Sequence, residues 1–222
     1  MSSLTLTDWN HVKYWCDNTT FNIPVSYMAE AVNPKYPRDA FSLGQLASKI
    51  WLLQKLYPIA THPIQDWAIL GCWIGSIVPF LHKKFIINRV YGLDSDPQAI
   101  ELSEQFNQNY VQDSWKFKGV VADVSMLCTS NMEFFTGGEL IQIKPGVVIN
   151  TSCEHMDTQW FESADPDQLI VMQTNNSPNF EGHINTCASI DEMKEKYPLS
   201  NALYRGEMKL PSYTRYMQIG YK

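Results

Sequence analysis

The sequence predicts an α/β protein built on a doubly wound, mostly parallel seven-stranded sheet with an antiparallel pair of strands at its C-terminal edge. Short apolar runs alternate with segments of helical periodicity through the middle of the chain, as they do in strand–helix–strand units. Near the C-terminus, segments 203–210 and 213–221 alternate polar and apolar residues and are joined around Pro211 and Ser212. This pattern indicates two neighbouring antiparallel strands.

The chain is expected to divide near residue 60. Residues 1–59 hold no predicted strand and are expected to form a helical N-terminal cover segment, with a short helix around Trp9 and Tyr14. Residues 60–222 contain all the predicted strands and form the main domain. The size of the chain is sufficient for one such domain with a helical extension.

Helices are expected wherever apolar residues recur at a spacing of three or four. Asp39 or Ser42 is expected to cap the first helix, Asp96 the third and Ser189 the last, because short polar side chains at these positions accept hydrogen bonds from free backbone N–H groups. The predicted helices span residues 41–56, 76–85, 96–110 and 189–197.

Five continuous apolar runs are predicted to be parallel strands buried on both faces. In a sheet of this kind, ligands bind beyond the carboxyl ends of the strands, where the strand order reverses. The residues that follow each strand are therefore the candidates for function. The predicted strands span residues 67–70, 90–93, 117–122, 147–149 and 169–172.

Composition narrows the class of function. The formal net charge of −6 argues against a nucleic-acid partner, because binding a phosphate backbone requires a positive field. No run of 18 apolar residues exists, so no membrane partner is expected. The first ten residues lack the features of a signal peptide, and five cysteines without a CxxC pair suit a reducing compartment. We therefore expect a soluble cytoplasmic protein that acts on a small molecule.

Two turns after the first two strands offer a nucleotide site. Gly71 and Gly75 allow a tight turn around Cys72 and Trp73, and the helix that follows presents free N–H groups. Asp94, followed by Ser95, is placed to accept both hydroxyls of a ribose.

Polar residues also follow the third and fourth strands. Asp123 is placed to meet an adenine amino group, and its neighbour Val124 to contact the ring. After the fourth strand, Asn150, Glu154 and His155 form a dense polar cluster, in which a histidine near the pocket suits a general base.

These segments together resemble class I S-adenosylmethionine-dependent methyltransferases, which have a Rossmann-like fold. The resemblance is carried by WAILGCWIG, VYGLDSDPQAIELS, GVVADV and GVVINTSCEHM, within residues 60–180. It implies S-adenosylmethionine as cofactor, held by Gly71–Gly75, Asp94, Asp123 and Asn150. The sequence departs from the family at Ile69, where the family has an acidic residue, and at Trp73, where it has its middle glycine.

The resemblance also implies the reaction. The methyl group would pass to an oxygen or nitrogen of a small molecule, or of a protein side chain, in line with the sulfonium. Asn150 would lie beside the transferred methyl, and Glu154 and His155 would position or deprotonate the acceptor.

Other interpretations stay open. The glycine turn followed by an acid also fits a nicotinamide-dependent oxidoreductase, and the departures fit a catalytically silent cofactor-binding module. Asp94 is alternatively a cap for the next turn, and Asp123 a solvated loop acid. Trp73 is either a core plug or a lid over the cofactor. His155 is alternatively a hydrogen-bonding partner of the next helix.

No metal site is expected from the sequence. The candidate ligands would be Cys153, His155, His183 and Cys187, but the last two are four residues apart in a segment that Gly182 makes a loop, whereas this spacing aligns ligands only on a helix. Cys153 as a nucleophile would need a lowered pKa, for which only His155 is near in sequence.

Overall fold

The computed structural model does not cover the whole chain, and the short helix expected around Trp9 and Tyr14 lies outside the part it describes. None of the helices in the described part is long and apolar enough to span a membrane. The described residues are Tyr27, 33–61, 64–178, 180 and 182–222.

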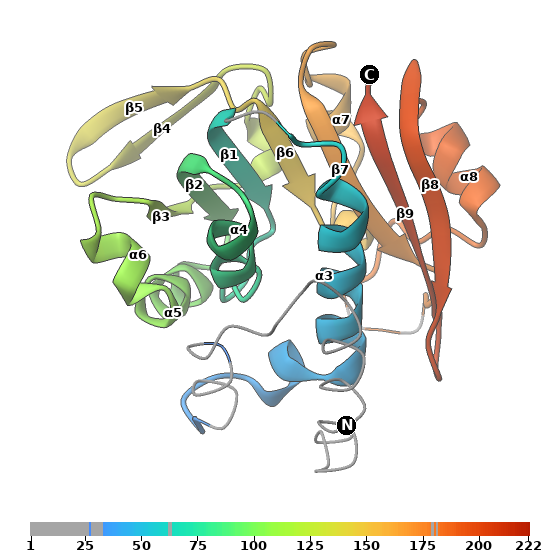
Figure 1. The fold of residues 1–222 in the computed structure, drawn as a ribbon, viewed down its shortest axis with the longest axis horizontal. Helices are drawn as coiled ribbons and strands as arrows, with labels where there is room; N and C mark the ends of the chain where they lie inside the picture. Colours follow the sequence, from blue (N-terminus) through green and yellow to red (C-terminus); the bar gives the residue numbers. More distant parts are fainter. Residues whose placement is uncertain (1–26, 28–32, 62–63, 179, 181) are drawn as a thin grey trace.

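Seven strands form a single mostly parallel sheet, as predicted, in the order β3-β2-β1-β6-β7-β9-β8 (Figure 1). The last strand, β9, lies between β7 and β8 and runs antiparallel to both, so β8 forms the edge. The chain continues from β1 to β2 on one side and returns to β6 on the other, which creates the predicted switch point beside β1. The strands are β1 (Ile64–Leu70), β2 (Ile87–Asp94), β3 (Phe117–Val121), β6 (Val147–Asn150), β7 (Leu169–Asn175), β8 (Asn201–Lys209) and β9 (Thr214–Tyr221).

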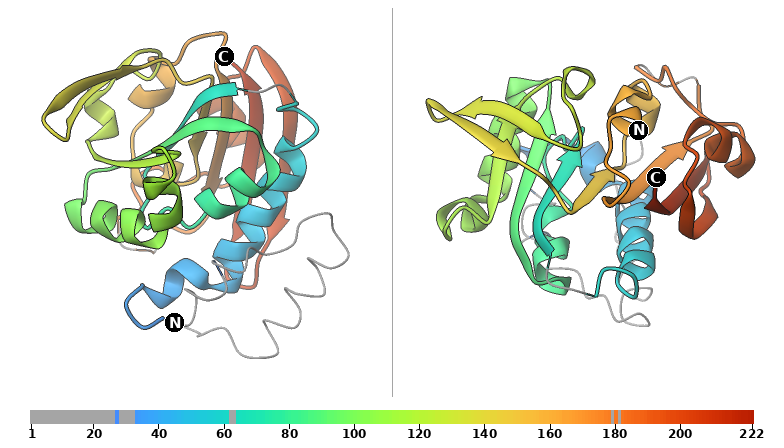
Figure 2. Two further views of the ribbon diagram at one scale, coloured as in Figure 1. Left: turned by 60° about the vertical axis from the view of Figure 1, so that its left-hand side comes forward. Right: turned by 90° about the horizontal axis from the view of Figure 1, so that it is seen from above.

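Helices cover both faces of the sheet. Alternate residues of β1 point to opposite sides: Trp67 and Ile69 join one buried cluster, whereas Ala68 and Leu70 join the other. The first cluster includes residues of α3, α4 and α5, and the second includes residues of α7 and α8, so α3 and α7 lie on opposite sides (Figure 2). The helices are η1 (Arg38–Phe41), α3 (Leu43–Leu56), α4 (Val78–Lys84), α5 (Pro97–Phe106), α6 (Gln108–Gln112), η2 (Val124–Met126), η3 (Cys153–His155), α7 (Gln159–Glu162) and α8 (Ile190–Lys196).

The predicted caps are largely confirmed. Ser42, rather than Asp39, caps α3 by accepting the Gln45 N–H at 3.4 Å. Asp96 accepts from the first turn of α5, and Ser189 accepts from the first turn of α8. Each cap satisfies a backbone donor that the helix itself leaves free.

Two elements differ from the prediction. The helix expected over 96–110 is broken at Asn107, whose side-chain amide donates to the carbonyl oxygens of Gly75 and Ser103. The sequence analysis did not predict the hairpin of β4 (Met132–Thr136) and β5 (Glu139–Ile143), which forms a separate two-stranded sheet.

Helix α3 packs directly on the sheet. The Gln173 side chain donates to the Ser48 carbonyl oxygen at 3.1 Å, and the Trp51 indole donates to the Tyr204 hydroxyl at 3.1 Å. Its N-terminal end lies at the end of the molecule where the parallel strands terminate (Figure 1). The described part of the N-terminal segment thus reaches the carboxyl ends of the parallel strands, and the division at residue 60 stays a prediction.

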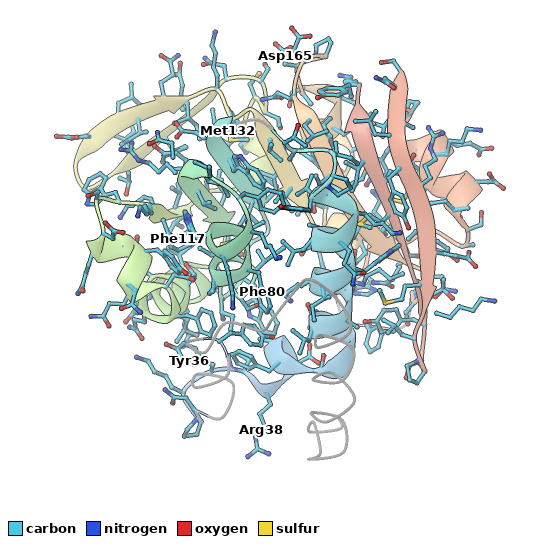
Figure 3. The ribbon with its side chains drawn as sticks, viewed as in Figure 1. Tyr36, Arg38, Phe80, Phe117, Met132 and Asp165 are labelled. Carbon is cyan, nitrogen blue, oxygen red and sulfur yellow. The ribbon has the colours of Figure 1, made fainter. Side chains whose placement is uncertain are left out.

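An aromatic cluster holds the residues that precede α3 in place. Tyr27 is fully buried, and its ring lies 5.3 Å from that of Phe41 and 4.9 Å from that of Phe80 in edge-to-face geometry. Tyr36 and Phe106 extend the cluster with ring centroids 5.3 Å apart. Phe80 and Tyr36 lie toward the same end of the molecule, with Asp165 at the opposite end (Figure 3). These contacts hold the N-terminal segment against α4 and α5.

Candidate active site

The turn after β1 and the acid after β2 meet at the switch point. The Asp94 carboxylate accepts the Trp73 N–H at 2.8 Å through Oδ2 and the Asp96 N–H at 3.1 Å through Oδ1. The turn itself depends on Gly71 and Gly75, whose φ angles of +61° and +63° lie in the left-handed region. The two features that the sequence analysis assigned to one nucleoside are therefore adjacent.

Trp73 occupies the position where the resembling family has a glycine. Its φ of +49° is left-handed, which is unusual for a bulky residue and stores strain in the turn. The side chain is partly buried, packs against the core on the α3 side, and lines the cavity described next. Trp73 therefore packs on the core, as a plug would, and also lines the cavity, while its role as a lid over a cofactor stays a prediction.

A cavity of about 480 Å³ opens at the carboxyl ends of the parallel strands. Its volume lies within the range of about 300–1,000 Å³ that is usual for small-molecule sites. It extends from the Gly71–Gly75 turn to the loop after β6 and the N-terminal end of α3. The residues that line it are Asp39, Gln45, Lys49, Ile69, Gly71, Cys72, Trp73, Ser76, Ile77, Asp94, Ser95, Ala122, Asp123, Val124, Thr151, Ser152, Glu154, His155, Met156 and Arg215.

Two residues from the segment after β3 line this cavity as expected. Asp123 is exposed and caps η2, where its Oδ1 accepts the Ser125 N–H at 3.0 Å and the Ser125 hydroxyl at 2.7 Å. Val124 is buried beside it, and Ala122 completes this wall. Asp123 therefore caps a helix and faces the cavity at once.

Two of the predicted site residues, Asn150 and Gly75, do not line the cavity. The side chain of Asn150 is fully buried, its Oδ1 accepts the Ser152 N–H at 2.9 Å, and its Nδ2 lies 3.1 Å from the Met156 sulfur. These contacts use its polar atoms to shape the loop after β6. Gly75 also has a structural contact away from the cavity, because its carbonyl oxygen accepts a hydrogen bond from the buried Asn107 amide.

Glu154 and His155 reach the far end of the cavity from η3. Glu154 is 3% exposed, and its Oε1 accepts from the Asn175 amide at 2.6 Å and lies 3.6 Å from Nη2 of Arg215. His155 is exposed, and its Nδ1 lies 3.1 Å from the Gly182 carbonyl oxygen. His155 thus bonds to a distant loop rather than to the following helix.

Among the cavity residues that were not predicted, four come from parts of the chain distant from the predicted strand ends. Asp39, Gln45 and Lys49 lie on η1 and α3, and Arg215 lies on β9. Lys49 is a charged residue on a helix turn occupied by buried Leu46 and Ile50, and this interruption of the apolar pattern was the available signal.

The buried charges at this end are coupled. Burial lowers the pKa of Lys49 to about 7; Arg215 adds to the lowering and Asp39 opposes it. Burial alone would lower the pKa of Arg215, but the Glu154 carboxylate raises it above its usual value. Glu154 therefore keeps Arg215 charged, whereas Lys49 gains or loses its charge near neutral pH.

The cysteines do not form the reactive or metal-binding groups considered from the sequence. Burial raises the pKa of the Cys153 thiol well above its usual value, which disfavours the thiolate that a nucleophile needs. Cys187 is also fully buried, with its pKa raised to about 11 by burial. The histidines His155 and His183 instead gather with Glu154.

The comparisons with known proteins identify the fold. No protein-family model and no curated protein matches the sequence. Among solved structures, the chain is similar to a magnesium protoporphyrin IX methyltransferase from Synechocystis with bound S-adenosylhomocysteine, with 13% identity, a TM-score of 0.61, and coverage of 97% of this chain and 99% of that one.

Two further structures differ in the chemistry that their names state. A geranyl diphosphate C-methyltransferase from Streptomyces coelicolor gives 12% identity, a TM-score of 0.57 and coverage of 98% of each chain. An N-methyltransferase from Bradyrhizobium japonicum gives 10% identity, a TM-score of 0.55, and coverage of 79% of this chain and 96% of that one. The chain thus has the Rossmann-like fold of the class I S-adenosylmethionine-dependent methyltransferases, as the resemblance in its sequence implied.

Proposed function

We propose that this chain binds S-adenosylmethionine and transfers its methyl group to an oxygen or nitrogen of a small-molecule acceptor. The observation that carries the proposal is the convergence of the Gly71–Gly75 turn and Asp94 on one cavity at the switch point, through the hydrogen bond from Trp73 to Asp94. The shared fold supports it, because proteins with this fold have been solved with S-adenosylmethionine or its demethylated product.

The nucleoside would lie between the first two turns. Each Asp94 oxygen uses one lone pair on a backbone N–H and keeps another for a ribose hydroxyl. Val124 and Ala122 would contact the adenine ring, with Asp123 at its polar edge. Asn150 would act as a positioning residue, because it holds the loop from Ser152 to Met156 against the turn.

The methionine end would lie toward α3. Ile69 is buried and apolar, so it offers no carboxylate to the methionine ammonium group. Asp39 lines the same cavity and is the carboxylate that we propose takes this part.

The acceptor would bind at the end formed by Lys49, Glu154, His155 and Arg215. The sulfonium supplies a methyl group with a good leaving group, so these residues need chiefly to align the acceptor for in-line displacement. Two basic side chains at the wall favour an acceptor that carries a carboxylate or phosphate group. The fold is shared by C- and N-methyltransferases, so the side chains at this end, rather than the fold, would select the acceptor atom.

A titration separates this proposal from the nicotinamide alternative. S-adenosylhomocysteine should change the intrinsic fluorescence of the protein and NAD⁺ should not, because Trp73 lines the cavity. The chain has seven tryptophans, so Trp73→Phe is the control that assigns the signal to this position. A response to NAD⁺ alone would refute the proposal.

Turnover separates an enzyme from a silent module. Incubation of the protein with methyl-labelled S-adenosylmethionine and a cell extract should place label in the small-molecule fraction. Label confined to protein would redirect the acceptor to a side chain, and no label in any fraction would contradict transfer.

A further inference from the structure

Three potential metal ligands gather at the acceptor end of the cavity. Glu154 and His155 lie on η3, and His183 lies in the loop between β7 and α8. One ligand atom of each lies within 4.8 Å of those of the other two, and the two imidazole rings meet edge to face with centroids 4.6 Å apart. The loop is fixed to η3 because the Glu154 carbonyl oxygen accepts the N–H groups of Ile184 and Asn185 at 2.8 and 3.0 Å.

Both histidines have one ring nitrogen, Nδ1, against a backbone carbonyl oxygen, which leaves Nε2 for a ligand. The Nδ1 of His155 lies 3.1 Å from the Gly182 carbonyl oxygen, and the Nδ1 of His183 lies 2.6 Å from that of Ser177. A carbonyl oxygen only accepts, so each Nδ1 carries a proton, and in the neutral imidazole Nε2 then has a free lone pair. Metal-bound histidines are oriented by this kind of outer hydrogen bond to a backbone carbonyl.

The carboxylate supplies an independent observation. Only 3% of the Glu154 surface is exposed. Its Oε1 accepts a hydrogen bond from the Asn175 amide and lies near the Arg215 guanidinium group. Its Oε2 is buried without a hydrogen-bond partner among the described residues. A buried carboxylate oxygen without a partner is costly, so a cation at this position would satisfy it.

We propose that Glu154, His155 and His183 bind one divalent first-row transition-metal ion. Two imidazoles and one carboxylate form the ligand set used for zinc and for non-haem iron, whereas Mg²⁺ and Ca²⁺ prefer oxygen ligands alone. The sequence-based expectation of no metal rested on a set that included Cys153 and Cys187. The folded chain brings a carboxylate to the two histidines instead.

The ion would change the role of the acceptor end, an extension that rests on the proposed function. Three protein ligands leave a position open, and Glu154 and His155 line the cavity, so an acceptor hydroxyl can bind there. Binding to the ion would lower the pKa of that hydroxyl, and its proton would pass to solvent. The hydroxyl oxygen would then form the new C–O bond while the methyl–sulfur bond of the sulfonium breaks, and the electron pair of that C–S bond would stay on sulfur. His155 acts as a ligand rather than as a general base.

Metal titrations of the full chain test the site without any methyl transfer. After chelator treatment and dialysis, we expect calorimetry with Zn²⁺ to give one ion per chain and Co²⁺ to give a visible absorption band that Zn²⁺ removes. His155→Gln and His183→Gln should each weaken binding by more than about 100-fold, because each removes a ligand and outer-shell changes alone reduce affinity by about 10–100-fold.

A matched control comes from His82, which stacks on Tyr110 and whose Nε2 lies 3.1 Å from the Lys116 carbonyl oxygen, outside the ligand group. His82→Gln should bind the ion as wild type does. No stoichiometric binding by wild type, or wild-type binding by both His155→Gln and His183→Gln, would overturn the site. S-adenosylhomocysteine binding is measured separately in the presence of chelator. This measurement tests the proposed function without the metal, and it also reports whether each variant is folded.

Discussion

The two ends of the cavity are built in different ways. The end at Gly71–Gly75 and Asp94 uses two neighbouring strand-to-helix turns and mostly backbone groups. The end at Lys49, Glu154 and Arg215 uses charged side chains from α3, η3 and β9, which are far apart in the sequence. The first end therefore depends on local turn geometry, whereas the second depends on the assembled sheet and on the balance of buried charges.

The largest effect is expected at the assembled end. Arg215→Met should lower the free energy of unfolding by about 3–5 kcal/mol, because it leaves the buried Glu154 carboxylate without its cationic partner. Urea denaturation of chelator-treated protein measures this loss. Adding Glu154→Gln should recover part of it, since the unpaired charge is then removed. Strictly additive losses would show that the two side chains are not coupled.

A somewhat smaller loss is expected at the turn. Gly75→Ala should reduce stability by about 2–4 kcal/mol, because the new Cβ would lie 2.7 Å from Nδ2 of the buried Asn107 at a φ of +63°. Gly137 has a φ of +62° with no atom within 4 Å of an added Cβ, so Gly137→Ala is the matched control. It should cost about 1 kcal/mol. Equal losses in the two variants would exclude the contact with Asn107 as the cause.

The turn and strand pattern could be predicted because it depends on local sequence. Pro79 in the first turn of α4, Asp96 as the cap of α5 and Ser189 as the cap of α8 each act within a few residues. The missed hairpin could also have been predicted, because a Gly-Gly pair is typical of a tight two-residue turn. Gly137 and Gly138 have the left-handed φ angles that such a turn requires. A stricter search for alternating residues around Gly-Gly would have found it.

The assembled end could not be predicted from local sequence. Lys49 and Arg215 are brought to Glu154 by the packing of α3 on the sheet and by the insertion of β9 between β7 and β8. His183 reaches His155 only because the loop before α8 bonds to the backbone of Glu154. Sequence spacing contains no signal for contacts of this range, so the sequence analysis considered His183 beside His155 as a ligand but did not join it to Glu154, and it did not include Arg215.

The stability of the protein is also expected to depend on pH through Lys49. Its pKa is lowered to about 7 from 10.5, chiefly by burial. Between these two values the unfolded chain binds more protons than the folded chain, so the stability of wild type should rise with pH relative to Lys49→Met. The variant should be the more stable below pH 7, and the gap should close as pH rises toward 10. A gap that does not vary with pH would show that Lys49 titrates normally.

The most direct test of the account is the affinity of S-adenosylhomocysteine for Asp94→Asn. Asparagine keeps an acceptor for the Trp73 N–H but loses the charge and one acceptor oxygen, so calorimetry should show binding weakened by about 10-fold or more, or about 1.4 kcal/mol. Asp96→Asn is the control, because Asp96 does not line the cavity and asparagine also caps helices well. Equal affinities of wild type and both variants would contradict a nucleoside site between Asp94 and the Gly71–Gly75 turn.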